Sequence, residues 1–281
     1  MSATTPKPIG TQPWVESVFD RIVCGVDGTE TSLLAVQQAT RLLPARRLLQ
    51  LVSVVEESPP GVPASTPDVR RRYAEAQHAL TAGHTVCPHA WTHIRLGSPS
   101  EVLTARAREI EATLIAVGAP STGRLGALVL GDTGTYVLQN APCSVLIARG
   151  GPDASAFPRS IVVGHDGSRT AERVTQVATG LAARFGASLR VLAATGGGGV
   201  DASRLPEVGV EWSDLPPVEA LVAASQEADL VVIGSSGLHG SRPLGSVSER
   251  VGHLAGSSVL VVRPPAHARG DVADDDAAPG R

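Results

Sequence analysis

The sequence contains the same pattern twice, and this internal repeat constrains the fold more than any other feature. The segment RIVCGVDGTETS, which begins at Arg21, matches SIVVGHDGSRTA, which begins at Ser160. Farther on, EATLIAVGAPSTG matches EADLVVIGSSGLH, and APCSVLIAR matches GSSVLVVR. Because the matching segments follow in the same order, the 281 residues are predicted to form two domains of one kind. We place these domains at 20–149 and 160–263.

The segments that flank the repeats have a different composition. Residues 1–19 and 264–281 are rich in proline, alanine and polar residues, and neither contains a periodic apolar pattern. Such segments cannot bury enough apolar surface to offset the entropy lost on ordering. We therefore expect two disordered tails.

Short apolar segments alternate with amphipathic ones in each copy, which predicts strands alternating with helices. In the first copy we expect strands at 22–26, 48–55, 91–96, 114–117 and 145–148, and helices at 31–43, 67–82, 100–110 and 133–139. In the second we expect strands at 161–163, 189–193, 208–212, 230–233 and 259–262, and helices at 170–184, 217–227 and 247–254. Strands that are apolar throughout are typical of a parallel sheet covered on both faces. The predicted fold class is α/β, with two tandem Rossmann-like open parallel sheets of five strands.

The second copy is shorter than the first between its second and third strands. Where the first copy has its second helix, the second copy has TGGGGVDASRLPE. Four consecutive glycines and a proline do not form a stable helix. The second copy is therefore predicted to lack its second helix.

Composition excludes several classes of function. The only lysine is Lys7, so the folded part has none for a P-loop, a protein kinase or a pyridoxal Schiff base. A formal net charge of −3 and 3% aromatic residues offer little to a phosphodiester backbone or to stacked bases. We expect no nucleic-acid partner.

Cysteine usage and hydropathy bear on the compartment. The 3 cysteines, Cys24, Cys87 and Cys143, are widely spaced, which fits a reducing environment better than a disulfide framework. No signal-peptide pattern and no apolar segment of membrane-spanning length is found. The expected protein is cytoplasmic and has no membrane partner.

Glycine-rich segments after the fourth strand of each copy are the best candidates for a ligand site. In the second copy Gly234, Gly237 and Gly240 follow the strand, and Gly245 and Ser246 precede a helix. A strand that continues into glycines and then a helix N-terminus can present backbone amides to a phosphate, although flexible connections also contain glycines.

An aspartate follows the first strand of each copy, Asp27 in the first and Asp166 in the second. In an open parallel sheet this position lies at the carboxyl edge, where ligands bind. Asp-Gly is also favourable turn chemistry, so the residue pair alone does not decide between a site and a turn.

Taken together and in this order, these residues resemble the universal stress protein family in its tandem form, whose fold is adenine nucleotide alpha hydrolase-like. The family pattern is Asp-Gly-Ser after the first strand, and G-x-x-G, nine residues and G-[ST] after the fourth. In members that bind ATP, the aspartate contacts the adenosine end, and the glycine loop holds the ribose and phosphates. The resemblance therefore implies a site for ATP, with or without Mg. The implied cofactor-binding residues are Gly164, Asp166, Gly234, Gly237, Gly245 and Ser246 in the second copy, and Gly25, Asp27, Gly118, Ser121 and Gly131 in the first.

Each copy departs from the family pattern in a different place. In the first copy, Ser121 replaces the second glycine and Asp132 follows Gly131 where a hydroxyl is expected. A carboxylate there repels a triphosphate unless a cation intervenes. In the second copy the spacer 238–244 is two residues short of the pattern, although the glycines and Ser246 are present. On the sequence we favour the second copy as the nucleotide site.

A metal site competes with this interpretation. The segment HTVCPHAWTH holds His84, Cys87, His89 and His93. In a helix, His89 and His93 would share a face and could bind zinc. The alternation around them predicts a strand instead, in which four residues span about 13 Å. We therefore expect no metal.

The resemblance also implies that the last strands of the two copies pair, so that the chain imitates a dimer, and a homodimer between chains would be compatible with it. The most favoured function is a regulatory or stress-response module that binds an adenine nucleotide without turning over a substrate, and is not an enzyme. Two alternatives stay open: a nucleotide-free scaffold that acts through protein contacts, and an ATP-using enzyme of the same superfamily.

Overall fold

The computed structural model describes residues 19–45, 47–57, 66–119, 130–150, 156–196, 200–206, 209–235 and 244–263. The first half contains strands β1 (Arg21–Gly25), β2 (Leu48–Val55), β3 (Trp91–Leu96), β4 (Leu114–Gly118) and β5 (Ser144–Ala148). Its helices are α1 (Glu30–Leu42), α2 (Pro67–Val86), α3 (Pro99–Glu109) and α4 (Asp132–Asn140). The two tails fall outside the described residues, except that Phe19 is buried in the core and so does not belong to a disordered tail.

The second half repeats this order without the long second helix. It contains β6 (Ser160–Gly164), β7 (Ser188–Ala194), β8 (Val210–Ser213), β9 (Leu230–Gly234) and β10 (Ser258–Val262). Its helices are α5 (Arg169–Phe185), α6 (Pro217–Ala224) and α7 (Ser246–Leu254), and a short 3₁₀ helix, η3 (Ala202–Arg204), lies between β7 and β8. The absence of an α-helix from the described part of this crossover agrees with the prediction from its glycines.

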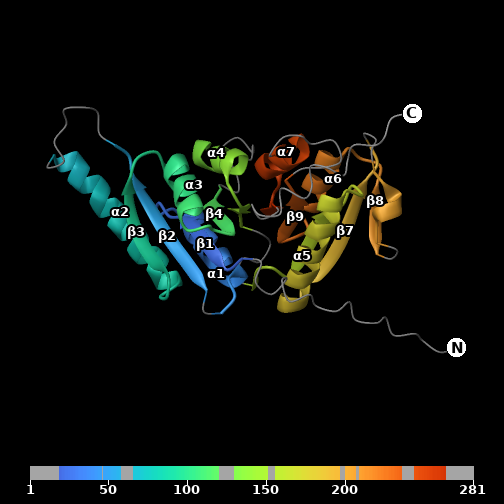
Figure 1. Ribbon diagram of the computed structural model, residues 1–281, viewed down its shortest axis with the longest axis horizontal. Helices are drawn as coiled ribbons and strands as arrows, with labels where there is room; N and C mark the ends of the chain where they lie inside the picture. Colours follow the sequence, from blue (N-terminus) through green and yellow to red (C-terminus); the bar gives the residue numbers. More distant parts are fainter. Residues whose placement is uncertain are drawn as a thin grey trace.

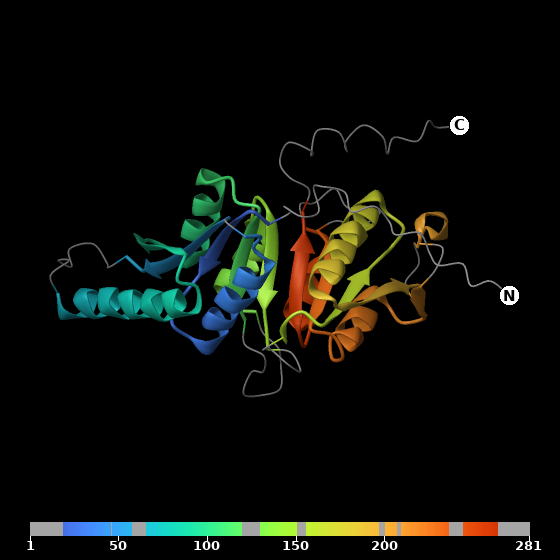
Figure 2. The same ribbon diagram turned by 90° about the horizontal axis from the view of Figure 1, so that it is seen from below.

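All ten strands form one continuous sheet in the order β3-β2-β1-β4-β5-β10-β9-β6-β7-β8. Strands are parallel within each half, as predicted, and β5 and β10 pair antiparallel at the centre, with Leu260 opposite Leu146. Figure 2 shows these two strands side by side in the middle of the molecule. The predicted five-stranded sheets are therefore joined, because two fully buried apolar strands cover each other's edge.

Helices cover both faces of the sheet, as Figures 1 and 2 show. One apolar core contains residues of α1, α2 and α5, and the other contains residues of α3, α4, α6 and α7. Both cores are largely aliphatic, which agrees with an aromatic content of 3%.

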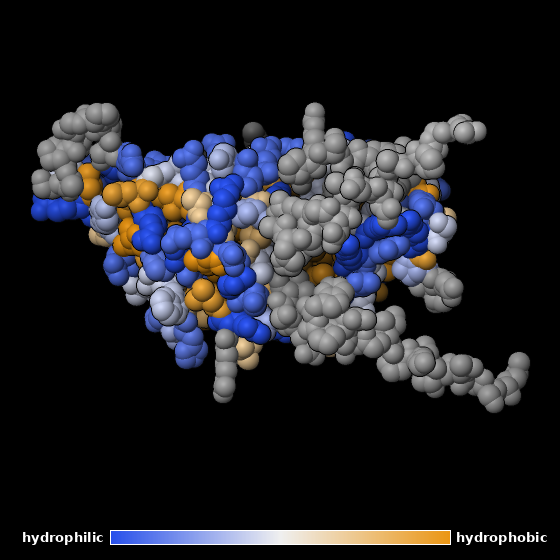
Figure 3. All heavy atoms as spheres, viewed as in Figure 1, coloured by the Kyte–Doolittle hydropathy of each residue, from blue (hydrophilic) through white to orange (hydrophobic). Residues whose placement is uncertain are grey.

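The two edge strands of the sheet are β3 and β8. They carry Trp91 (64% exposed) and Trp212 (54% exposed). On the face seen in Figure 3, apolar residues of the first half lie among hydrophilic ones. Since β5 and β10 are interior strands, neither offers a free edge to another chain, and a homodimer stays a prediction.

Arginines of each half bind helix ends of the other half. Arg149, which follows β5, donates to carbonyl oxygens in the last turn of α7 at 2.7 and 3.3 Å. Arg263, which follows β10, donates to carbonyl oxygens at the end of α4. On the other face, Arg184 of α5 donates to three carbonyl oxygens at the end of α1, at 2.8 to 3.0 Å. A cation at a helix C-terminus compensates the helix dipole and satisfies carbonyls that have no partner within the helix.

Candidate functional site

The topology brings the predicted aspartates and glycines to one edge of the sheet. In each half the first strand lies between the second and the fourth strands. The chain therefore continues to one side of the first strand and later returns to its opposite side. Asp27 follows β1 and Gly118 ends β4, and these two strands are parallel neighbours. Asp166 and Gly234 occupy the same places in the second half, after β6 and at the end of β9. Ligands of open α/β sheets bind in the crevice at such a switch point.

The turn after β1 is built around Asp27. Gly28 takes the left-handed backbone conformation (φ +84°), which few other residues adopt, and Thr29 then caps α1 by accepting from the Ser32 amide. The Asp27 carboxylate accepts from the Thr29 amide at 2.9 Å and from the Thr29 hydroxyl at 2.6 Å. Partial desolvation raises the pKa of Asp27, but the hydrogen bonds from Thr29 and Ser32 outweigh it and leave the pKa below its ordinary value. Asp27 is therefore an ionised acceptor at neutral pH.

Gly118 lets β4 approach α1 closely. A Cβ atom at this position would lie 2.4 Å from the carbonyl carbon and oxygen of Thr31 and 2.7 Å from the Ser32 nitrogen. All three are backbone atoms of the first turn of α1, so a side chain there would displace the helix. The predicted site glycine thus has a packing role in addition to any role in a loop. Gly25, at the end of β1, approaches a side chain instead: its Cβ would lie 2.9 Å from Leu103 Cδ1.

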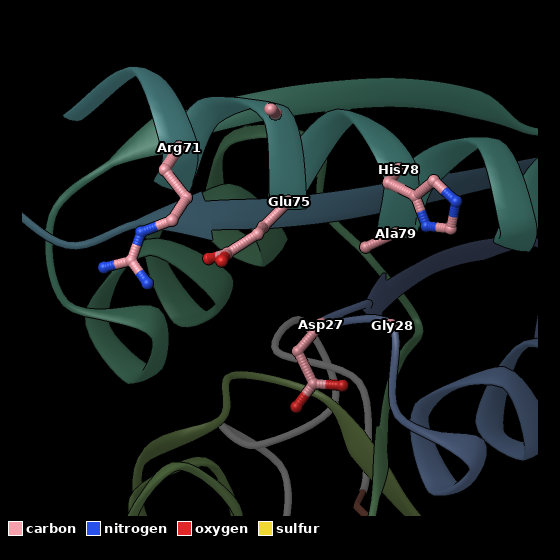
Figure 4. Close-up of a pocket in the computed structure, with 7 residues that line it drawn as sticks. Asp27, Gly28, Arg71, Glu75, His78 and Ala79 are labelled. Atoms are coloured by element: carbon pink, nitrogen blue, oxygen red, sulfur yellow. The ribbon is translucent and has the colours of Figure 1, made fainter. Parts of the chain in front are cut away.

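A hollow of about 430 Å³ lies between this turn and α2. It is lined by Asp27, Gly28, Arg71, Ala74, Glu75, His78 and Ala79. Figure 4 shows Arg71, Glu75 and His78 on α2 at one side and the turn at the other, with the Asp27 carboxylate directed away from the helix. The α2 residues were not predicted from the sequence, although their spacing of i, i+4 and i+7 places them on one helix face.

Gly131 and Gly245 are the N-cap residues of α4 and α7. Among the described residues, no atom lies within 4 Å of a Cβ built at Gly131. The first turn of α4 contains Asp132, and the exposed Ser246 begins α7. In the second half, the Gly245 amide already donates to the Ser235 carbonyl at 2.5 Å.

The turn after β6 differs from the turn after β1. The buried His165 precedes Asp166, and the Gly167 amide donates to its Nδ1 at 3.0 Å. Burial lowers the pKa of His165, although Asp166 and Glu172 raise it, so the imidazole is neutral and can accept this bond. The Asp166 carboxylate accepts from the Ser168 amide at 3.0 Å.

Two more predicted glycines of the second half, Gly164 and Gly234, lie in contact with neighbouring elements. A Cβ at Gly164 would lie 3.1 Å from Leu221 Cδ2, and the Gly234 carbonyl accepts from the Ser248 hydroxyl at 2.5 Å. Two predicted site residues, Ser121 and Gly237, lie outside the described residues.

The possible metal ligands near β3 lie on different elements: His84 is in α2, Cys87 is its buried C-cap and His93 is in β3. Over the part of the chain that the structure describes, no three His, Cys, Asp or Glu side chains form a group that could hold a metal ion. Within the same residues, no helix has the length and apolar character needed to cross a membrane.

The chain is similar to known proteins over most of its length. The family model described as universal stress protein family matches residues 19–149 and 204–263. A universal stress protein of Mycolicibacterium smegmatis is 27% identical over 86% of this chain and 97% of its own length. One of Mycobacterium tuberculosis strain H37Rv is 28% identical over 86% of this chain and 96% of its own. A universal stress protein structure from Archaeoglobus fulgidus covers 89% of this chain and 99% of that one, with a TM-score of 0.68 at 18% identity, which is evidence of a shared fold. The family match, together with the strand order, shows that this chain belongs to the universal stress protein family.

Proposed function

We propose that the first half binds an adenine nucleotide such as ATP at the carboxyl ends of β1 and β4. The observation that carries this proposal is the ionised Asp27 at the switch point between β1 and β4, next to the close packing of Gly118 on α1. A hollow lies beside the same turn, between it and α2. The family match supports the first half, because it spans β1 to β5 there but begins only at residue 204 in the second half, after Asp166. This assignment differs from the preference for the second copy that the intact glycines suggested.

The side chains near this site suggest how a nucleotide is held. Asp27 accepts hydrogen bonds from the adenosine end, as in the family members that bind ATP. Without a lysine in the described residues, the phosphates depend on backbone amides, on the N-terminus of α4 at Gly131, or on an arginine such as Arg71 of the hollow. Asp132 in the first turn of α4 would repel them, so a divalent cation such as Mg²⁺ between this carboxylate and the phosphates fits the residues present.

We expect ATP to bind the purified chain, and the Asp27→Asn variant to bind it at least about tenfold more weakly, a loss of about 1.4 kcal/mol. Asparagine keeps an oxygen for the Thr29 bonds but loses the charge, so the turn stays folded while the ligand contact weakens. Isothermal titration calorimetry on nucleotide-free protein measures the affinity. Asp20→Asn is the matched control, since Asp20 precedes the opposite end of β1.

A module that binds a nucleotide without turning it over should retain the nucleotide and leave ATP unhydrolysed. We expect heat or acid denaturation of the freshly purified protein to release an adenine nucleotide, and ATP incubated with the protein to yield no phosphate above a protein-free control. If neither released nucleotide nor binding is found, the nucleotide-free scaffold is the correct reading. Phosphate release that Asp27→Asn abolishes would instead establish an enzyme.

A further inference from the structure

In the second half the crossover between β7 and β8 takes the place that α2 has beside the aspartate turn of the first half, and it lies closer to the turn. In the first half the turn at Gly28 meets α2 in ordinary contact, with 3.4 Å between a Cβ at Gly28 and the Ala79 Cβ. In the second half a Cβ at Gly167 would lie 2.2 Å from the carbonyl oxygen of Asp201. The backbone of the β7–β8 crossover therefore lies directly on the turn that carries Asp166.

One backbone hydrogen bond joins this crossover to the turn, and further bonds stabilise the crossover itself and attach it to α5. The Asp201 amide donates to the Asp166 carbonyl at 3.0 Å. The Asp201 carboxylate caps η3 by accepting from the Ser203 amide at 3.0 Å and from the Ser203 hydroxyl at 2.6 Å. Arg204 lies 3.7 Å from this carboxylate and 4.0 Å from that of Glu172 on α5. The crossover is thus attached to both the turn and the helix that follows it.

The start of the same crossover is also fixed. The Thr195 amide donates to the Ser213 carbonyl at 2.8 Å, and the Gly196 amide donates to the Leu215 carbonyl at 3.2 Å. A Cβ at Gly196 would lie 2.1 Å from the Asp214 carbonyl oxygen, so the chain is tightly packed there as well.

Charged and polar groups of the crossover are paired within the second half itself. Arg204 lies within 4.0 Å of the carboxylates of both Asp201 and Glu172. The hydrogen bonds from Ser203 lower the pKa of Asp201, so this carboxylate is ionised at neutral pH. At the other border, the Gly245 amide at the start of α7 is already bonded to Ser235. This amide is therefore not available to an anionic ligand.

We infer that the chain holds one nucleotide rather than two, and that the segment Asp201–Arg204 closes the second half's site as a built-in occupant. This inference rests on the proposed function, because it states which of two related sites is open. The repeat therefore has a division of roles: the first half binds the ligand, and the second half serves as its structural partner.

Calorimetric titration with ATP tests the stoichiometry. We expect one nucleotide per wild-type chain, and a single binding event weakened at least tenfold in Asp27→Asn, with no tight event left. Asp20→Asn should bind one nucleotide with the affinity of the wild type. Two nucleotides per chain, or tight binding that survives in Asp27→Asn, would overturn the inference and leave nucleotide binding itself intact.

Hydrogen exchange of the ligand-free protein, followed by NMR, tests the closure separately. The Asp201 amide should exchange at least 100-fold more slowly than in an unfolded chain, because it is bonded to Asp166. Arg204→Ala should speed its exchange by about threefold, as expected for a partly exposed ion pair, without affecting amides of β1. If the wild-type Asp201 amide exchanges at the unfolded rate, the closure is wrong. If the wild type binds no nucleotide, the proposed function fails, and slow exchange still establishes the closed turn.

Discussion

Replacing Arg149 by alanine is expected to lower the free energy of unfolding by about 4 kcal/mol. The Arg149 side chain is 0% exposed, and it donates to two carbonyls at the end of α7 from the opposite half. Burial lowers its pKa to about 10, so the guanidinium still carries its charge at neutral pH. Alanine would remove two charge-assisted hydrogen bonds, leave the α7 carbonyls without partners and open a cavity between the halves. Urea denaturation followed by circular dichroism measures the loss.

Two further substitutions separate packing from hydrogen bonding at this position. Arg149→Met refills most of the volume and should recover part of the stability, but it cannot bind the carbonyls. Arg70→Ala, on the exposed face of α2, should change stability by no more than about 0.5 kcal/mol. If Arg149→Ala unfolds at the same urea concentration as Arg70→Ala, the arginine contact between the halves contributes nothing to stability.

The strands and most helices could be predicted because their signals are local. The fully apolar β4 and β5 and the amphipathic α5 appear in the structure within a few residues of their expected bounds. The end of α2 was predicted too early, at residue 82, whereas the helix continues through Gly83, a poor helix former, to Val86. In the structure Gly83 is buried against the sheet, where a Cβ would lie 3.0 Å from Leu51 Cδ1. Tertiary packing thus extends the helix beyond its local preference.

The start of the helix after β3 was predicted one residue late. The sequence indicated a helix over 100–110, whereas α3 runs from Pro99 with Ser98 as its N-cap. Proline at the first helical position explains the earlier start, because its fixed φ suits the helix and its missing amide is not needed there.

The aspartates and glycines of the candidate site could be found from the sequence because a motif fixes their spacing. The contact between Asp201 and the Gly167 turn could not, because it joins segments that are not neighbours in sequence and depends on the path of an irregular crossover. The arginine contacts between halves were missed for a related reason. Arg149 and Arg263 stand at matching places of the repeat, but nothing local indicates that each reaches a helix of the other copy.

Gly118→Ala is expected to destabilise the protein by about 3 kcal/mol, because the fold and the proposed site both require a residue without a Cβ at this position. Its Cβ would meet the Thr31 carbonyl and the Ser32 nitrogen, and backbone atoms of α1 cannot move aside as a flexible side chain can. Displacing this turn would also disturb the bonds that Thr29 makes to Asp27, so nucleotide affinity should fall together with stability. Thermal denaturation with and without ATP measures both effects in one experiment, because a bound ligand raises the unfolding temperature. Gly150→Ala is the matched control, since no atom of the described residues lies within 4 Å of a Cβ there, and it should leave stability within about 0.5 kcal/mol of the wild type. Equal stability of the two variants would show that β4 and α1 do not approach as closely as described, and the position of Asp27 relative to β4 would then have to be revised.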